Sequence, residues 1–346
     1  MTHLTLRTSR SGGGGLSVRL RRRSLLVAAA VVAAALALAV TALATGDFPV
    51  PVRDVVAALA GGGDAGTSFV VRTLRAPRVL TAALVGAAFG ASGAVFQSLT
   101  GNPLGSPDVI GFTYGAATGG IVAILLVSPE AGTVAPFAAA GGLLTAAAVY
   151  GLAWRHGGVQ PFRLVLVGLG VGYTMLSVNA YLLTRAELTD ALVAQRWLLG
   201  SVNGTDWATV RTLAVTLAVL LPAVALLSRP LVAMELGDDA SAALGVRVQV
   251  SRPAVALAGV CLAAAGTAAA GPVAFVALAA PQIGRRLTGV TGPGVTVAAL
   301  TGAALLVGAD LTAQRLLPQD LPVGLVTGFL GGGYLVHLLR RSGRVS

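Results

Sequence analysis

The chain has very little of the chemistry that soluble enzymes use. Only 11% of its 346 residues are charged, it has one cysteine and three histidines, and all 24 of its basic residues are arginine. A soluble domain carries about 25% charged residues. The one cysteine, Cys261, excludes a disulfide or a multi-cysteine metal site within the chain, and we expect it to be a packing residue. The histidines (His3, His156 and His337) lack metal-ligand spacing.

Motifs for nucleotide binding and catalysis are also missing. The sequence contains no G-x-x-x-x-G-K-[ST], so the chain does not cradle ATP phosphates by that route. The glycine runs that begin at Gly12, Gly61 and Gly331 do not lie between a strand and a helix, as a phosphate loop would. We find no catalytic set and expect neither enzymatic activity nor a cofactor.

Apolar residues dominate instead. They make up 55% of the chain, and the mean hydropathy is +0.83, which predicts a protein that crosses a membrane many times. A net charge of +11 would suggest nucleic acid as the partner of a soluble protein. In a membrane protein the excess of arginine in cytoplasmic loops explains it better, and we expect no nucleic acid to bind.

The hydrophobic pattern predicts an all-α fold of ten transmembrane helices. The transmembrane domain covers residues 25–340, after a disordered basic cytoplasmic tail (1–24) and before a short cytoplasmic tail (341–346). Arg22 and Arg23 precede the first run as they would in a secretion signal, but that run of about 20 residues favours an uncleaved helix. The ten runs are 25–45, 79–99, 109–128, 136–154, 163–184, 208–227, 253–270, 273–287, 295–314 and 322–339.

The arginines indicate the orientation. With the N-terminus inside, sixteen arginines fall in cytoplasmic segments and eight in outer segments. This bias predicts that both termini are cytoplasmic.

The eighth run, 273–287, is the weakest of the ten. It is short, it begins after Gly271 and Pro272, and Pro281 lies near its end. Such interrupted spans are where transporters expose irregular backbone to a pathway, although a tilted packing helix would explain the pattern as well. A weak sequence similarity between Leu84–Gly93 and Leu257–Gly266 favours an inverted repeat.

Ionisable groups inside the spans are scarce. Asp310 is the one acid well inside a run, and we expect it to pair locally with Arg315, which follows about a turn later. A proton-coupled transporter normally needs buried acids as relays. The energy for transport is therefore expected to come from outside this domain.

The stretch between the sixth and seventh runs, 231–252, is long for a helix–helix link, which is typically about 2–8 residues. Its early acids and the later Gly245 predict one amphipathic helix that ends at this glycine. We interpret the stretch as a rigid docking element.

Several motifs resemble one family. They are RAPRVL…GAAFGASG…Q…NPLGSP…G…GA (75–117), WLLGSVNGTDW (197–207), LGDDASAALG (236–245), GPVAFVALAAPQIGRR (271–286) and DLPVGLVTGFLGGG (320–333). Together they are similar to the FecCD family of iron-siderophore and cobalamin permeases, over about residues 72–340. Two positions depart from the family pattern, Gln282 where histidine is usual and Gly333 where proline is common.

The resemblance implies a permease subunit of a binding-protein-dependent ABC importer in the bacterial inner membrane, with ferric siderophores as the expected substrate class. It implies a dimer with a second permease subunit, two ATP-binding subunits and an extracytoplasmic binding protein. It also implies three sets of residues: binding-protein docking at Arg75, Arg78 and Arg315; ATPase coupling at Leu236, Gly237, Ala240, Leu244 and Gly245; pathway or gating at Gln97, Asn102, Pro103, Pro107, Gly271, Pro272 and Pro281.

Other interpretations remain open. The arginines could simply reach toward lipid headgroups. A proton-coupled secondary transporter or a membrane-embedded enzyme would fit the hydrophobicity, although the missing relay acids and the missing catalytic set argue against them.

Overall fold

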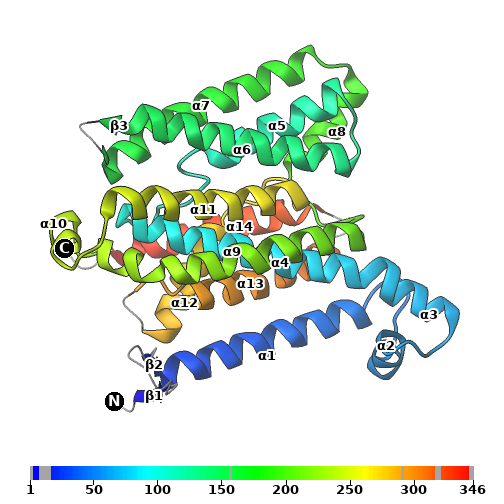
Figure 1. Ribbon diagram of the computed structural model, residues 1–346. Helices are drawn as coiled ribbons and strands as arrows, with labels where there is room; N and C mark the ends of the chain where they lie inside the picture. Colours follow the sequence, from blue (N-terminus) through cyan, green and yellow to red (C-terminus); the bar gives the residue numbers. More distant parts are fainter. Residues whose placement is uncertain (1–2, 8–16, 156–157, 290–291, 316–320, 343–346) are drawn as a thin grey trace.

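The computed structural model describes the chain except for residues 1–2, 8–16, 156–157, 290–291, 316–320 and 343–346 (Figure 1). It is a helical bundle, as the sequence predicts. The principal helices are α1 (Arg22–Ala44), α4 (Ala76–Thr100), α5 (Phe112–Leu126), α6 (Ala131–Ala153), α7 (Pro161–Arg185), α9 (Trp207–Met234), α11 (Val248–Ala270), α12 (Val276–Thr288), α13 (Val295–Arg315) and α14 (Val323–Ser342).

Shorter elements lie between the principal helices. They are α2 (Val52–Leu59), α3 (Ala65–Phe69), the π-helix η1 (Val70–Arg75), α8 (Leu188–Leu198), α10 (Asp238–Ala243) and a two-residue strand pair, β3 (Trp154–Arg155) with β4 (Gly158–Val159). Because α3, η1 and α4 run on without a break, the second span is preceded directly by helix.

The N-terminal tail differs from our expectation of disorder. Strands β1 (His3–Arg7) and β2 (Ser17–Arg21) pair antiparallel, with His3 opposite Arg21, and β2 leads directly into α1. The alternating polar and apolar residues of HLTLR and SVRLR suit a strand. Residues 8–16 between the strands lie outside the described part of the chain.

In the described residues, seven helical segments are long and apolar enough to cross a membrane: α1, the continuous segment 65–100, α6, α7, α9, α11 and α13. Helix α5 and the described start of α14 are apolar but shorter. Helix α12 is the shortest of the principal helices, with 13 residues, and corresponds to the eighth run.

The helices form layers around α4 (Figure 1). Helices α11, α13, α12 and α9 pack around α4, while α5, α6 and α7 form a second layer and α1 lies along the opposite edge, against α13. One end of the bundle carries α10, β3 and the β1–β2 pair. The other end carries α2, α3 and α8.

Small residues allow α4 to lie at the centre. A Cβ atom added at Gly86 or Gly90 would collide with backbone carbonyls of α13, at Gly302 and Ala298, and one added at Gly93 would collide with the carbonyl of Ala277 in α12. The prediction that these glycines let a neighbouring helix approach closely is confirmed.

We expect Gly93→Ala to destabilise the fold by about 1–3 kcal/mol, because the added methyl group meets rigid backbone rather than a movable side chain. Thermal unfolding in detergent would measure this as a lower Tm. Gly151→Ala, in α6, is the matched control, since no other group lies within 4 Å of its added Cβ. A Tm for Gly93→Ala equal to that of the native chain would contradict the contact.

Candidate functional site

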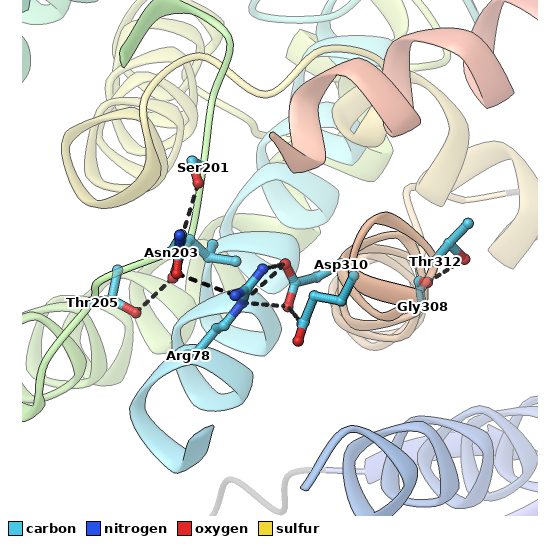
Figure 2. Close-up of polar contacts among 9 residues, drawn as sticks. Arg78, Ser201, Asn203, Thr205, Gly308, Asp310 and Thr312 are labelled. Carbon is cyan, nitrogen blue, oxygen red and sulfur yellow. Dashed lines mark hydrogen bonds and ion pairs between the residues drawn. The ribbon is translucent and has the colours of Figure 1, made fainter. Parts of the chain in front are cut away.

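A polar cluster joins three segments at the end of the bundle that carries α2 and α3 (Figure 2). Arg78 of α4 donates to Asp310 of α13, with its Nη2 atom 2.9 Å from Oδ1 and its Nε atom 3.1 Å from Oδ2. Its Nη1 atom donates to the side-chain oxygen of Asn203, 3.2 Å away, in the connection between α8 and α9. Asp310 also accepts from Gln314 at 2.7 Å. The side chain of Asp310 is 4% exposed and that of Arg78 16%.

The predicted pair between Asp310 and Arg315 is therefore wrong. Five residues along a helix is about 140° of rotation, so the two side chains leave α13 on different faces. Arg315 instead donates to the carbonyl of Thr45 at 3.1 Å and lies 3.8 Å from the carboxylate of Asp47, in the connection after α1.

Arg75 also binds the connection after α1. Its guanidinium donates to the carbonyl of Leu43 at 2.8 Å and to that of Phe48 at 2.7 Å. The carbonyls at a helix C-terminus lack partners within the helix, so Arg75 satisfies one of these for α1. The three arginines expected to dock a binding protein thus lie at one end of the molecule, and each already binds a group of this chain.

At the other end, a cavity of about 460 Å³ lies between the last turn of α4, the end of α9 and α12. Its wall is polar. Arg285 donates to Gln97, Ser98 donates to Glu235, and Gln282 donates to the carbonyl of Pro103 at 2.9 Å. These bonds connect α12, α4, the end of α9 and the turn after α4. The predicted residues Gln97, Asn102 and Pro103 all line this cavity.

The connection from α9 to α11 contains a shorter helix than predicted. Residues 231–252 do not form one amphipathic helix, because α9 continues to Met234 and α11 begins at Val248, which leaves only the six residues of α10. The prediction that Gly245 ends the helix is confirmed, since its φ is +81° and its N–H donates to the carbonyl of Ala242. Gly237, with φ +96°, precedes α10.

Polar side chains anchor helix α10, and the apolar side chains in and beside it are exposed. Asp238 forms an ion pair with Arg252, and the buried Ser241 donates to the carbonyls of Ala233 and Gly237. Leu236 and Leu244 are each 66% exposed, and Ala240 is exposed too. Two leucines held outward on an anchored turn suit contact with another protein.

Irregular backbone precedes α12, as the glycine and proline there predicted. Gly271 has φ +72°, and the carbonyl of Ala270 just before it accepts from Ser201 at 2.7 Å. Pro281 lies inside α12 and is buried, and Pro107 is buried in the turn after α4. Phe275 has φ +67°, a strained backbone for any residue but glycine.

A second cavity, of about 410 Å³, lies beside this segment, bounded also by the turn after α4, α5 and α7. Tyr114, Tyr173 and Phe275 line it together with Asp108. Burial raises the pKa of Asp108 to about 6, although the Thr113 hydroxyl, which donates to it at 2.6 Å, opposes that rise. The sequence did not predict this group, because its members come from four separate segments.

A bundle of apolar helices around a glycine-packed central helix, with two cavities beside an interrupted span, is typical of a multi-pass membrane transport protein. The chain belongs to the FecCD transport family, which matches residues 33–341. Among curated relatives, the ferric enterobactin transport system permease protein FepG of Escherichia coli is 45% identical over 94% of this chain and 99% of that protein. The achromobactin transport system permease protein CbrC of Dickeya dadantii is 40% identical over 88% of each.

A solved structure agrees on the fold. It is described as an inward-facing conformation of a metal-chelate type ABC transporter, and it superposes with a TM-score of 0.80 at 24% identity, covering 92% of this chain and 99% of that one. The family model and the two curated relatives confirm the family predicted from the motifs.

We expect loss of either partner in the Arg78–Asp310 pair to destabilise the protein by about 3–5 kcal/mol, because a buried charge is left without its counter-ion. Arg78→Gln and Asp310→Asn should each lower the stability measured by unfolding in detergent. The double variant should recover part of that loss, since no unpaired charge remains. Arg53→Gln, at an exposed position of α2, is the control and should change little. Additive losses in the double variant would show that the two side chains do not interact.

Proposed function

We propose that this chain is a permease subunit of a binding-protein-dependent ABC importer that brings a ferric siderophore into the cell. The observation that carries the proposal is the 45% identity to FepG, which extends over almost all of both chains. The second relative, CbrC, is named for another siderophore, achromobactin. The shared chemistry is an iron chelate rather than one particular molecule.

In this proposal the principal helices are ten spans of an inverted-repeat core, the architecture of a type II importer permease. The two weakly similar segments, 84–93 and 257–266, support this architecture, because they lie in neighbouring helices. Ser92 of α4 donates to the carbonyl of Gly259 in α11 at 2.7 Å, and Gly266 of α11 faces Phe89 of α4. A second permease subunit, identical or different, would complete the pathway.

The proposed orientation places both termini and α10 in the cytoplasm. Figure 1 supports it, since α10 and the β1–β2 pair lie at one end of the bundle and α2 and α3 at the other. The sixteen-to-eight distribution of arginines assigns the first end to the cytoplasm.

Single cysteines test the orientation in a Cys261→Ser background. Asp64→Cys, before α3, should react with an impermeant maleimide in intact cells, and Asp239→Cys, in α10, should react only after lysis. Both positions are exposed. The reverse pattern would refute the orientation.

Coupling to the ATPase is proposed to occur through Leu236, Gly237, Ala240, Leu244 and Gly245. The exposed leucines give a small apolar contact, and the Ser98–Glu235 bond links the base of this segment to α4. Arg75, Arg78 and Arg315 are proposed to face the binding protein at the other end, where Arg75 and Arg315 also hold the connection after α1 in place.

The importer reconstituted in proteoliposomes tests the function. ATP is enclosed in the proteoliposomes, and the binding protein is added outside. The enclosed ATP should drive uptake of a ferric siderophore delivered by the binding protein. Leu244→Asp should abolish uptake without lowering the amount of inserted permease, because it places a charge in the apolar contact. Leu188→Asp, at the opposite end and 78% exposed, is the control for ATPase binding. Normal uptake by Leu244→Asp would exclude α10 as the coupling element. Uptake without ATP would favour a secondary transporter.

A proton-coupled mechanism finds no comparable support. Asp310, the acid that a relay would use, is held by Arg78 and Gln314.

A further inference from the structure

The cavity beside Phe275 has an unusual wall for this chain. Aromatic residues make up only 5% of the sequence, yet Tyr114 of α5, Tyr173 of α7 and Phe275 before α12 meet around one space of about 410 Å³. Small-molecule sites typically enclose about 300–1,000 Å³, so this space admits one arm of a chelate rather than a whole one. Three separate elements must be in place to form it.

The backbone at Phe275 shows that this arrangement has a cost. Among the described residues it is the one non-glycine with positive φ. Such a conformation costs about 1–3 kcal/mol and persists where the surrounding structure holds it, often at functional sites. Gly331 of α14 leaves the room that the Phe275 side chain occupies, since a Cβ there would collide with it. The fold thus keeps a strained aromatic residue at the cavity wall.

Glycine also shapes the opposite wall. A Cβ added at Gly172 of α7 would lie 3.4 Å from the Tyr114 ring, in contact with it. Gly172 itself lines the cavity, together with Leu169 and Tyr173 of the same helix.

The cavity contains one acid and no basic residue. Asp108 accepts a hydrogen bond from Thr113, and its carboxylate makes no ion pair with any residue that the structure describes. Burial disfavours the charged form of this carboxyl group and so raises the pKa of Asp108. An unpaired carboxylate away from bulk water is unfavourable until a cation compensates it. Aromatic faces attract the same kind of ligand, because the ring quadrupole presents negative charge to a cation.

We propose that this cavity binds an ammonium group carried on one arm of the transported chelate, with Asp108 as its counter-ion and Tyr114, Tyr173 and Phe275 around it. The proposal rests on the proposed function and adds a preference among substrates. A wholly anionic chelate would be repelled by Asp108. A chelate with a protonated amine would gain one ionic and up to three cation–π contacts.

The test compares two ferric trihydroxamates that differ in one terminal functional group. One arm ends in a primary amine in the first chelate and in an N-acetyl amide in the second. Uptake is measured with the full importer in proteoliposomes. The native permease should take up the amine chelate with a KM about five- to thirtyfold lower, the range expected from a charge pair and cation–π contact. Asp108→Asn keeps the size of the side chain and an acceptor for Thr113. In this variant the KM values of the two chelates should become about equal, while uptake of the acetylated chelate stays unchanged.

Tyrosine variants test the aromatic part. Tyr173→Ala should weaken the preference for the amine, and Tyr173→Phe should keep it, because the ring rather than the hydroxyl makes the contact. The binding protein is the same in every sample, so a change in preference between native and variant permease arises in the permease.

Three results would overturn the site: equal KM values for both chelates with the native permease, an unchanged preference in Asp108→Asn, or transport of other ferric siderophores but of neither trihydroxamate. Failure to transport any ferric siderophore would instead overturn the proposed function.

Discussion

The structure depends on the direct backbone contact of α4 with α13 and α12. Gly86, Gly90 and Gly93 face carbonyl groups rather than side chains, so α4 lies closer to its neighbours than helices with larger residues could. In a membrane there is little hydrophobic drive for helices to associate, and close van der Waals packing has to supply it. This contact brings Arg78 within reach of Asp310 at one end of α4 and Gln97 within reach of Arg285 at the other.

Most of the fold could be predicted from the sequence, because hydrophobic length is a strong signal in membrane proteins. Each of the ten apolar runs corresponds to a principal helix, and the interruption at Gly271 and Pro272 is present. Local signals failed where a long-range partner decides the outcome. Asp310 pairs with Arg78, 232 residues away, and a spacing of five within one helix gave no hint of this.

Part of the candidate site could also be predicted from the sequence. Gly245, with positive φ after α10, could be predicted as a helix end. The start of α10 after Gly237 could not, because the acids of its first turn look the same in a longer helix. Ser98, Glu235 and Arg285 are ordinary residues in the sequence. They become a connected set only when α4, α9 and α12 meet around one cavity.

The turn after α4 separates the two cavities and explains why they differ. Asn102 and Pro103 face the polar cavity, and Leu104, Ser106 and Asp108 face the aromatic one. Gln282 holds this turn by donating to the carbonyl of Pro103 from α12. Glu235, at the base of α10, binds Ser98 only a few residues before the turn. A displacement of α10 would therefore act on α4 next to the wall between the cavities. The same hydrogen bonds that stabilise this end of the bundle thus link the proposed ATPase contact to the proposed substrate contact.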